Sequence, residues 1–290
     1  MEVVKIKTKD ENLFIGYAVS RIGGRPENQD SFGFADTPLG LLITVCDGMG
    51  GGPGGKTAST IAVSEIIAGI NEARKDEETE NIINEEIANV IIKAIRRANM
   101  AIIEYGNEEP SLKGMGSTAT VLLISEKSAY IAHVGDSRVY QLRGKKKVFR
   151  TFDHSMVFEW VKEKRLTEEQ ARLSANSNII TRALGVQPDV EVDVEEVPYE
   201  RGDRFVLCTD GIHGSMPEKE LLKMLANKKT VLSTVTDDIA TYVDNLGRSV
   251  GGHHDNLTLA IVETKKNSKM KKESFISKIL KTKLKITTKK

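Results

Sequence analysis

The chain has 290 residues, a formal net charge of +1 and two cysteines. This length is enough for one large domain or two small ones with a substantial core. From residue 264 onward there are 11 lysines and one glutamate, so this tail carries +10 and the remaining residues carry −9. An acidic body of this kind argues against nucleic acid as its main partner.

The two cysteines, Cys46 and Cys208, both lie within apolar runs. Two buried thiols make no disulfide framework and are typical of a reducing compartment. The N-terminal residues lack the apolar core of a signal peptide, and no apolar run approaches the ~20 residues needed to cross a bilayer. We therefore expect a soluble, cytoplasmic protein.

The first half of the chain predicts strands, then helices, then strands again. Strands are expected at 13–20 and 39–47, with a polar loop between them. Two helices follow, and in the second, about 80–105, apolar residues recur at the i, i+3, i+4 spacing of a buried helix face. From 117 to 152, short β-rich runs separated by tight turns predict an antiparallel meander.

The second half predicts a charged helical stretch at 155–175, strands near 189–197 and 204–210, two helices within 217–247, and a last strand at 256–262. Direct connections between strands dominate, so the order is not a repeating βαβ pattern. We expect antiparallel sheets whose outer faces are covered by helices, an α+β protein.

Residues 45–59, VCDGMGGGPGGKTAS, allow two interpretations. Residues 50–57 match the P-loop pattern G-x-x-x-x-G-K-T, after a strand and before a helix. However, Pro53 lacks the N–H that a phosphate-binding loop needs, and glycine runs match this pattern easily. The antiparallel surroundings also differ from the parallel sheet that holds a P-loop. We therefore expect no nucleotide-binding site.

The second interpretation concerns aspartates beside apolar runs. Asp47, Asp136 and Asp210 each follow such a run, Asp255 precedes the last strand, and Asp30 lies in the loop before the second strand. One aspartate of this kind is more often an ordinary turn residue. Five of them could meet where strand ends converge, and clustered carboxylates need a cation, with oxygen ligands favouring Mg²⁺ or Mn²⁺.

Eight motifs carry a resemblance to a known family and cover residues 13–263 almost completely. In chain order they are RPENQD (25–30), DGMGG (47–51), GSTATV (116–121), HVGDSRVY (133–140), FDHS (152–155), TRALG (181–185), CTDG (208–211) and DNLT (255–258). In this order the chain resembles metal-dependent protein phosphatases of the PPM, or type 2C, family, and most of all its compact bacterial members.

The resemblance implies a four-layer αββα sandwich, in which two antiparallel β-sheets are flanked by helix pairs. Residues 1–263 would form the phosphatase domain, with a helical flap at about 155–188, and 264–290 a basic tail. The implied activity is Mg²⁺/Mn²⁺-dependent hydrolysis of phosphoserine and phosphothreonine proteins by direct attack of a metal-bridging water. A catalytically silent regulatory protein and a small-molecule phosphatase remain alternatives. A partner kinase and a monomeric state are also expected.

The family's metal ligands transfer to five positions of this sequence. Asp47 matches the ligand that bridges both metal ions, and the Gly48 carbonyl binds the second ion. Asp210 and Asp255 match the ligands of the first ion. Asp136 matches a ligand of a third, weaker ion that Asp210 would share.

Two further residues complete the implied catalytic set with Asp47. Asp30 matches the acidic residue that steadies metal-bound water. Arg25 matches the arginine that holds the substrate phosphate, a task that suits the planar guanidinium fork.

Some positions depart from the family pattern or imitate a site. Gln29 replaces a glutamate of many relatives, which could weaken the second metal site, and Met49 stands where some relatives have a histidine. The flap lacks the usual His-Pro pair, which leaves substrate choice open.

The run His-His-Asp at 253–255 resembles a set of metal ligands. We expect only the aspartate to bind metal, because neighbouring side chains of an extended segment point in opposite directions. We expect His154 to be structural.

The basic tail carries apolar residues among its lysines, and six of them would cover about half of a helix, although Lys283 interrupts this face: Phe275, Ile276, Ile279, Leu280, Leu284 and Ile286. Such a segment could contact an anionic membrane or an acidic partner. A disordered, solubilising tail is the equally supported alternative.

Overall fold

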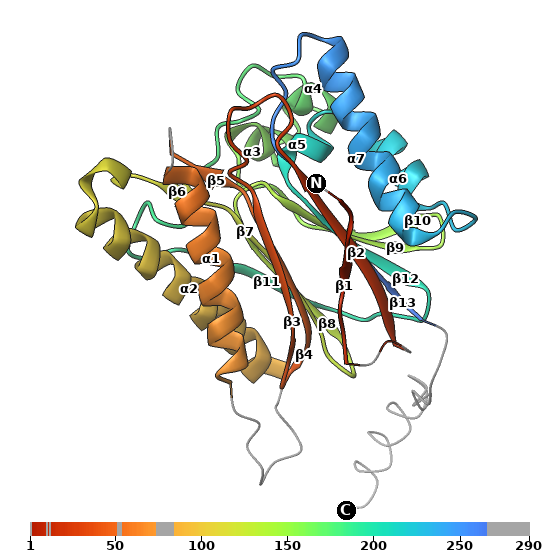
Figure 1. Ribbon diagram of the computed structural model, residues 1–290, viewed down its shortest axis with the longest axis horizontal. Helices are drawn as coiled ribbons and strands as arrows, with labels where there is room; N and C mark the ends of the chain where they lie inside the picture. Colours follow the sequence, from red (N-terminus) through yellow and green to blue (C-terminus); the bar gives the residue numbers. More distant parts are fainter. Residues whose placement is uncertain (1, 10, 12, 51–53, 74–83, 266–290) are drawn as a thin grey trace, which may run out of the picture.

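The structure is a computed structural model that describes all residues except 1, 10, 12, 51–53, 74–83 and 266–290. The amphipathic segment of the basic tail therefore lies outside the described residues. In the described part, two antiparallel sheets pack face to face, and helices cover the outer face of each (Figure 1). This arrangement confirms the predicted αββα sandwich.

One sheet has six strands in the described part of the chain, and all neighbours in it are antiparallel. Across the sheet they are β1 (Val4–Ile6), β2 (Phe14–Arg21), β13 (Leu257–Thr264), β12 (Asp203–Cys208), β9 (Arg138–Arg143) and β10 (Lys146–Arg150).

The other sheet has five described strands, again antiparallel throughout. Across the sheet they are β11 (Asp193–Val197), β8 (Ala129–Val134), β7 (Ala119–Ile124), β4 (Gly40–Cys46) and β3 (Ser31–Thr37). A short ribbon of β5 (Gly48–Met49) and β6 (Gly116–Ser117) extends one end of this layer.

Two helix pairs form the outer layers, the flap adds two shorter helices, and a four-residue helix follows β12. Their bounds are α1 (Gly54–Asn71), α2 (Asn84–Glu108), α3 (Met156–Lys162), α4 (Glu168–Arg172), α5 (Asp210–His213), α6 (Glu218–Leu225) and α7 (Leu232–Ser249), with a 3₁₀ turn at Pro110–Leu112. The pair α1 and α2 covers the five-stranded sheet, whereas α6 and α7 cover the six-stranded sheet (Figure 1).

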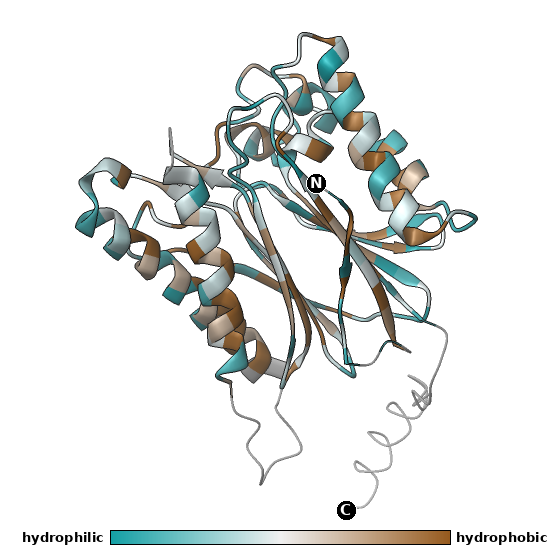
Figure 2. Cartoon of the chain, viewed as in Figure 1, coloured by the Kyte–Doolittle hydropathy of each residue, from teal (hydrophilic) through white to brown (hydrophobic). Residues whose placement is uncertain are grey.

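Three apolar layers separate the four structural layers, and the hydrophobic side of each outer helix faces its sheet (Figure 2). Most of the predicted stripe of the second helix is buried, as Ile91, Ile95 and Ile102 of α2 show, but Tyr105 at its end is 43% exposed. Ile239 belongs to the core beneath α7, and Phe205 lies in the core between the sheets. Burial of these helix faces and sheet faces is the main favourable term in folding.

The structure corrects two sequence-based assignments. The region between the first two predicted strands is not only a loop, because β3 occupies Ser31–Thr37 as an edge strand with half-buried residues. Its Gly33 lies against α1, where a Cβ would come within 2.6 Å of Val63 Cγ1. The strand expected at 204–210 ends earlier, at Cys208, and Asp210 begins the short helix α5.

Among the described residues, none of the helices combines the length and apolarity that a membrane span requires.

Candidate metal and phosphate site

Strand register brings the predicted aspartates to one edge of the sandwich. In the β3–β4 pair Ser31 lies opposite Cys46, so Asp30 and Asp47 leave the sheet at the same end. In the β12–β13 pair Cys208 lies opposite Leu259, so Asp210 and Asp255 also lie at one end.

A hollow of about 460 Å³ lies at this edge, and its lining includes six of the seven predicted site residues: Arg25, Asp47, Gly48, Asp136, Asp210 and Asp255. The seventh, Asp30, is 2% exposed, and its Oδ2 accepts a hydrogen bond from Thr209 Oγ1 at 3.0 Å. The structure therefore brings all of the predicted site residues together.

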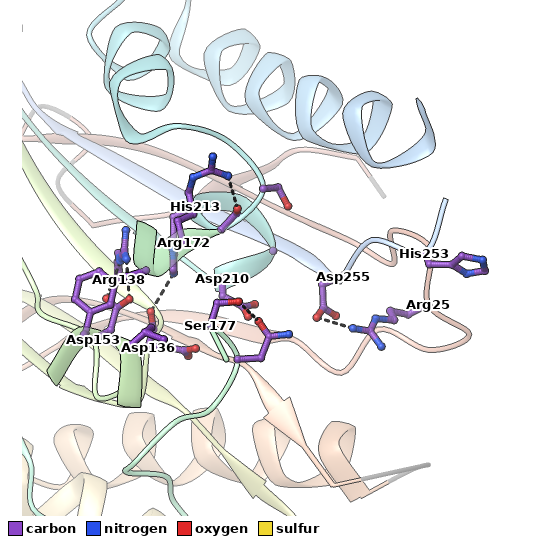
Figure 3. A pocket seen from close by; sticks show the side chains of 17 residues that line it. Arg25, Asp136, Arg138, Asp153, Arg172, Ser177, Asp210, His213, His253 and Asp255 are labelled. Atoms are coloured by element: carbon purple, nitrogen blue, oxygen red, sulfur yellow. Dashed lines mark hydrogen bonds and ion pairs between the residues drawn. The ribbon is translucent and has the colours of Figure 1, made fainter. Parts of the chain in front are cut away.

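A second hollow of about 280 Å³ adjoins the first and extends beneath the flap (Figure 3). The two hollows share Arg25, Asp136, Asn178, Asp210 and Asp255. In the close view, Asp210 lies between the Arg138–Asp153 pair on one side and the Arg25–Asp255 pair on the other (Figure 3). The shared carboxylates thus lie where the two hollows meet.

The carboxylates of the cluster destabilise one another's ionised forms. Burial, and then the charges of Asp30 and Asp210, raise the pKa of Asp47 well above its usual value. Burial and Asp255 raise the pKa of Asp210 to about 6. Burial raises the pKa of Asp30 to about 7, although hydrogen bonds from Thr258 and Thr209 oppose this shift. This cluster is therefore short of positive charge.

Two buried oxygen atoms of the cluster, Asp30 Oδ1 and Asp210 Oδ1, have no hydrogen-bond partner. Such atoms are uncommon in folded proteins and indicate a missing ligand. A hard divalent cation would satisfy them and neutralise the repulsion, since Mg²⁺ and Mn²⁺ prefer oxygen ligands. The residues present therefore fit divalent metal ions.

The backbone of Asp47 is fixed from the neighbouring strand ends. Its N–H donates to Thr118 Oγ1 at 2.9 Å, while its carbonyl accepts from the Thr118 N–H at 2.8 Å and from Ser117 Oγ at 3.0 Å. A side chain at Gly48 is excluded, because its Cβ would lie 1.9 Å from the Gly55 carbonyl oxygen. The glycines near the start of α1 thus permit close backbone packing at a metal site.

Arg25 lies at the rim of the hollow, on a loop held against the segment before β13. Its Nη2 donates to Asp255 Oδ2 at 2.9 Å, and its side chain is 49% exposed (Figure 3). The Gly24 N–H donates to the His254 carbonyl at 2.9 Å, and a Cβ on Gly24 would lie 1.8 Å from the Gly252 carbonyl oxygen. This close contact places the guanidinium beside the carboxylates.

Sequence reasoning did not assign a role to several residues that shape the site. Asn256 accepts the Gln29 N–H with Oδ1 and donates to the Ile22 and Glu27 carbonyls, all within 2.9 Å. Asn256 and Thr118 belong to the motifs DNLT and GSTATV, so the motifs contained the signal. Asn178 and Ile180 enter from the flap, whose position only the tertiary structure defines.

A second group of potential ligands was not predicted. Among the described residues, His133, His154 and Asp193 bring their ligand atoms within 4.8 Å of one another. The register of β11 on β8 places Asp193 opposite His133, and the two imidazole rings stack with centroids 4.4 Å apart.

Hydrogen bonds already occupy this histidine cluster. His133 Nε2 donates to the Phe152 carbonyl at 2.8 Å, and His154 Nδ1 accepts the Gly135 N–H at 3.2 Å. The proton of neutral His154 is then on Nε2, which lies 3.1 Å from Asp193 Oδ2. Burial lowers the pKa of His154 to about 4. These contacts are those of the structural residue that we expected at this position.

The structure also distinguishes the surroundings of the remaining candidate residues, the two histidines before Asp255 and the two cysteines. His254 Nε2 lies 2.8 Å from Asp244 Oδ1, whereas His253 belongs to the lining of the flap-side hollow together with Asp255. Cys46 and Cys208 are fully buried, and burial raises the pKa of each thiol to about 12. Both thiols therefore stay protonated and pack as small core residues.

Comparison with known proteins agrees with this geometry. A family model described as Protein phosphatase 2C matches residues 19–248. Serine/threonine phosphatase stp of Listeria innocua is 36% identical over 240 residues, which cover 82% of this chain and 91% of that protein. Protein phosphatase PhpP of Streptococcus pneumoniae is 31% identical over 239 residues, with coverage of 82% and 92%.

Solved structures show the same fold. The S. agalactiae serine/threonine phosphatase superimposes with a TM-score of 0.76 at 31% identity, covering 87% of this chain and all of that chain. The catalytic domain of PstP, solved in complex with two manganese ions, has a TM-score of 0.72 at 26% identity and covers 88% of this chain and 99% of that chain. The chain therefore belongs to the protein phosphatase 2C family and is a serine/threonine protein phosphatase.

Proposed function

We propose that the carboxylate edge described above is the active site and that it hydrolyses phosphoserine and phosphothreonine in proteins with two Mn²⁺ or Mg²⁺ ions. The observation that carries this proposal is the pair of buried oxygens without partners, Asp30 Oδ1 and Asp210 Oδ1, within a cluster of mutually repelling carboxylates. The two manganese ions of the similar PstP structure support the number of ions.

In this proposal Asp47 would be a ligand of both ions, and the Gly48 carbonyl would be a ligand of the second. Asp210 and Asp255 would hold the first ion, and Asp136 and Asp210 would hold a third, weaker one. When bound, such ions make water nucleophilic at neutral pH and stabilise the negative charge that develops at phosphorus.

The remaining roles belong to Arg25 and Asp30. Arg25 binds two phosphate oxygens with its guanidinium, after exchanging its contact with Asp255 for the substrate. Asp30 accepts a hydrogen bond from the attacking water with Oδ1, while Thr209 holds Oδ2 in place. Both residues thereby orient the reactants for attack in line with the leaving serine or threonine oxygen.

The domain boundaries follow from the same proposal. Residues 1–263 would act as one phosphatase domain, and the flap at about 155–188 would contact the polypeptide around the phosphorylated residue, because Asn178 and Ile180 line the hollow. We expected the basic tail at 264–290, but Thr264 is the last residue of β13 and the Lys265 N–H donates to the Leu13 carbonyl at 2.7 Å, so a separate tail would begin after Lys265. This tail would contact an anionic membrane surface or an acidic partner, or would only keep the protein soluble.

The cellular setting is also part of the proposal. The substrates would include a partner kinase, since a phosphatase of phosphoproteins opposes a kinase. The two buried, unpaired cysteines support a reducing, cytoplasmic location. We also propose that the protein acts as a monomer.

The test is turnover of a phosphothreonine peptide and of p-nitrophenyl phosphate with Mn²⁺, Mg²⁺ or EDTA. We expect metal-dependent turnover of both, with the peptide preferred. Replacement of Arg25 by Ala should raise KM for the peptide about tenfold or more, and Arg25→Lys should restore part of the loss. Turnover of the small ester alone would indicate a small-molecule phosphatase, and no turnover with any metal would refute the proposal.

A further inference from the structure

The first two turns of α1 hold the segment that carries Asp30. Lys56 Nζ donates to the Asp30 carbonyl at 2.7 Å and to Ser31 Oγ at 3.0 Å. One turn later, Ser59 Oγ donates to the Gln29 carbonyl and lies 2.9 Å from Ser31 Oγ. Residues three apart share one helix face, so Lys56 and Ser59 together clamp three consecutive residues, 29–31.

A lysine is an unfavourable choice at this place in a helix. Helix α1 begins at Gly54, and its first turn contains Lys56 but no acidic residue. The positive end of the helix dipole repels a cation there. Burial lowers the pKa of the half-buried Lys56 ammonium, and the charges of Asp30 and Glu27 oppose this shift only in part. What the ammonium does gain at this place is its two hydrogen bonds, to the Asp30 carbonyl and to Ser31 Oγ.

The held segment leads directly into the carboxylate cluster. Thr209 fixes the Oδ2 atom of the Asp30 side chain, and the Asp30 N–H donates to Asn28 Oδ1 at 3.2 Å. The Asp30 carbonyl is fixed from outside the loop by Lys56. A change in the peptide on either side of Asp30 would move its carboxylate relative to Asp47 and Asp210.

We propose that Lys56 is a positioning residue: its ammonium holds the Asp30 carbonyl and the Ser31 hydroxyl, so that the Asp30 carboxylate stays beside Asp47 and Asp210. This inference rests on the proposed role of Asp30. Lys56 acts through Asp30 and does not itself touch the substrate.

The experiment compares Lys56→Met, which removes the ammonium but keeps the chain length, with Lys56→Arg, which keeps a cationic donor. Lys93→Met, at an exposed lysine of α2, is the matched control. Two quantities are measured: steady-state turnover of a phosphothreonine peptide at saturating Mn²⁺, and amide hydrogen exchange of residues 29–31 in EDTA.

For Lys56→Met we expect kcat to fall about tenfold with KM within about twofold, because a misplaced carboxylate disturbs the reaction more than peptide binding. Exchange at residues 29–31 should become at least about tenfold faster in the metal-free protein, because a clamp on this backbone is lost. Lys56→Arg should restore most of both properties, and Lys93→Met should change neither.

The proposal is overturned if Lys56→Met matches Lys93→Met in both measurements, or if Lys56→Arg is as impaired as Lys56→Met. Melting temperatures of all variants in EDTA show whether each one is folded, and Lys56→Arg tests the proposal should Lys56→Met unfold. Absence of turnover in the unmodified protein would instead refute the proposed function. The exchange measurement would then still decide whether Lys56 holds this segment.

Discussion

The described part of the chain contains two clusters of potential metal ligands, and they differ in how their polar atoms are satisfied. In the carboxylate cluster, Asp30 Oδ1 and Asp210 Oδ1 are buried without partners, and burial raises the pKa of both residues. In the histidine cluster, His133 and His154 both make hydrogen bonds through ring nitrogens, and burial lowers their pKa values. A divalent cation would satisfy the polar atoms of the first cluster, whereas hydrogen bonds already satisfy those of the second.

The difference shows that proximity alone does not define a metal site. The ligand atoms of His133, His154 and Asp193 lie within 4.8 Å of one another. Metal binding through His154 Nε2 would move its proton to Nδ1, which faces the Gly135 N–H, so two donors would oppose each other. The Arg182 guanidinium, which donates to Asp193 Oδ1 at 2.8 Å, adds a competing positive charge.

The largest difference in kcat should appear when an aspartate is replaced by asparagine in each of the two clusters. Asp47→Asn should lower kcat about 10³-fold or more, because it removes a ligand proposed to bind both ions. Asp193→Asn should leave kcat within about threefold of the unmodified protein's value, because the Asp193 side chain contacts His154 and Arg182, outside the carboxylate cluster. Steady-state kinetics with p-nitrophenyl phosphate and Mn²⁺ would measure both.

The two variants should also differ in stability without metal. Asp47→Asn should raise the melting temperature in EDTA, because it relieves charge repulsion, whereas Asp193→Asn should lower it. Equal effects of the two substitutions on kcat would contradict the assignment of the carboxylate cluster as the metal site.

The next largest effect concerns His154. His154→Ala should lower the free energy of unfolding by about 1–3 kcal/mol, because it leaves the Gly135 N–H and the Asp193 carboxylate without this partner. The loss should be the same in EDTA and in Mn²⁺, measured by urea denaturation. A loss that appeared only with metal present would show that His154 takes part in metal binding.

A moderate effect should appear in the pH dependence of metal stabilisation. The raised pKa values of Asp30, about 7, and Asp210, about 6, mean that the metal-free folded protein binds more protons than the unfolded chain above about pH 4. Their protonation stabilises the metal-free fold most at low pH, and this contribution is lost as the pH rises through 6 to 7.

Because Mn²⁺ needs ionised carboxylates, the melting temperature in Mn²⁺ minus that in EDTA should increase between about pH 5.5 and 7.5. Titration of the buried histidines affects both conditions and cancels in this difference. Differential scanning calorimetry would measure it, and a difference that stays constant or shrinks with pH would argue against metal binding by these carboxylates.

The smallest effect should come from Arg182→Gln. Its side chain is 31% exposed, and its ion pairs with Glu191 and Asp193 are screened by solvent. We expect a loss below about 1 kcal/mol in the free energy of unfolding. Calorimetry with zinc should detect no additional binding site in Arg182→Gln, because the His154 proton still faces Asp193. An additional zinc site in this variant would show that Arg182 alone excludes the metal from the histidine cluster.

The sequence by itself determined the fold class and the members of the candidate site. Helix periodicity predicted α2, and short β-rich runs joined by tight turns predicted the meander from β7 to β10. Ordered motifs named Asp47, Asp210 and Asp255. These features are local, because hydrophobic period and turn residues act over a few positions. The edge strand β3 was missed, since its half-buried residues and Gly33 carry little strand signal.

Only the tertiary structure decided which polar atoms are satisfied. Strand register places Asp30 beside Asp47, in a cluster where two buried carboxylate oxygens have no hydrogen-bond partner. The same pairing rules place Asp193 beside His133, where hydrogen bonds complete the site. The contact of Lys56 with the Asp30 carbonyl joins residues 26 positions apart. Burial and partner geometry depend on residues far apart in the chain, so no local pattern in the sequence could specify them.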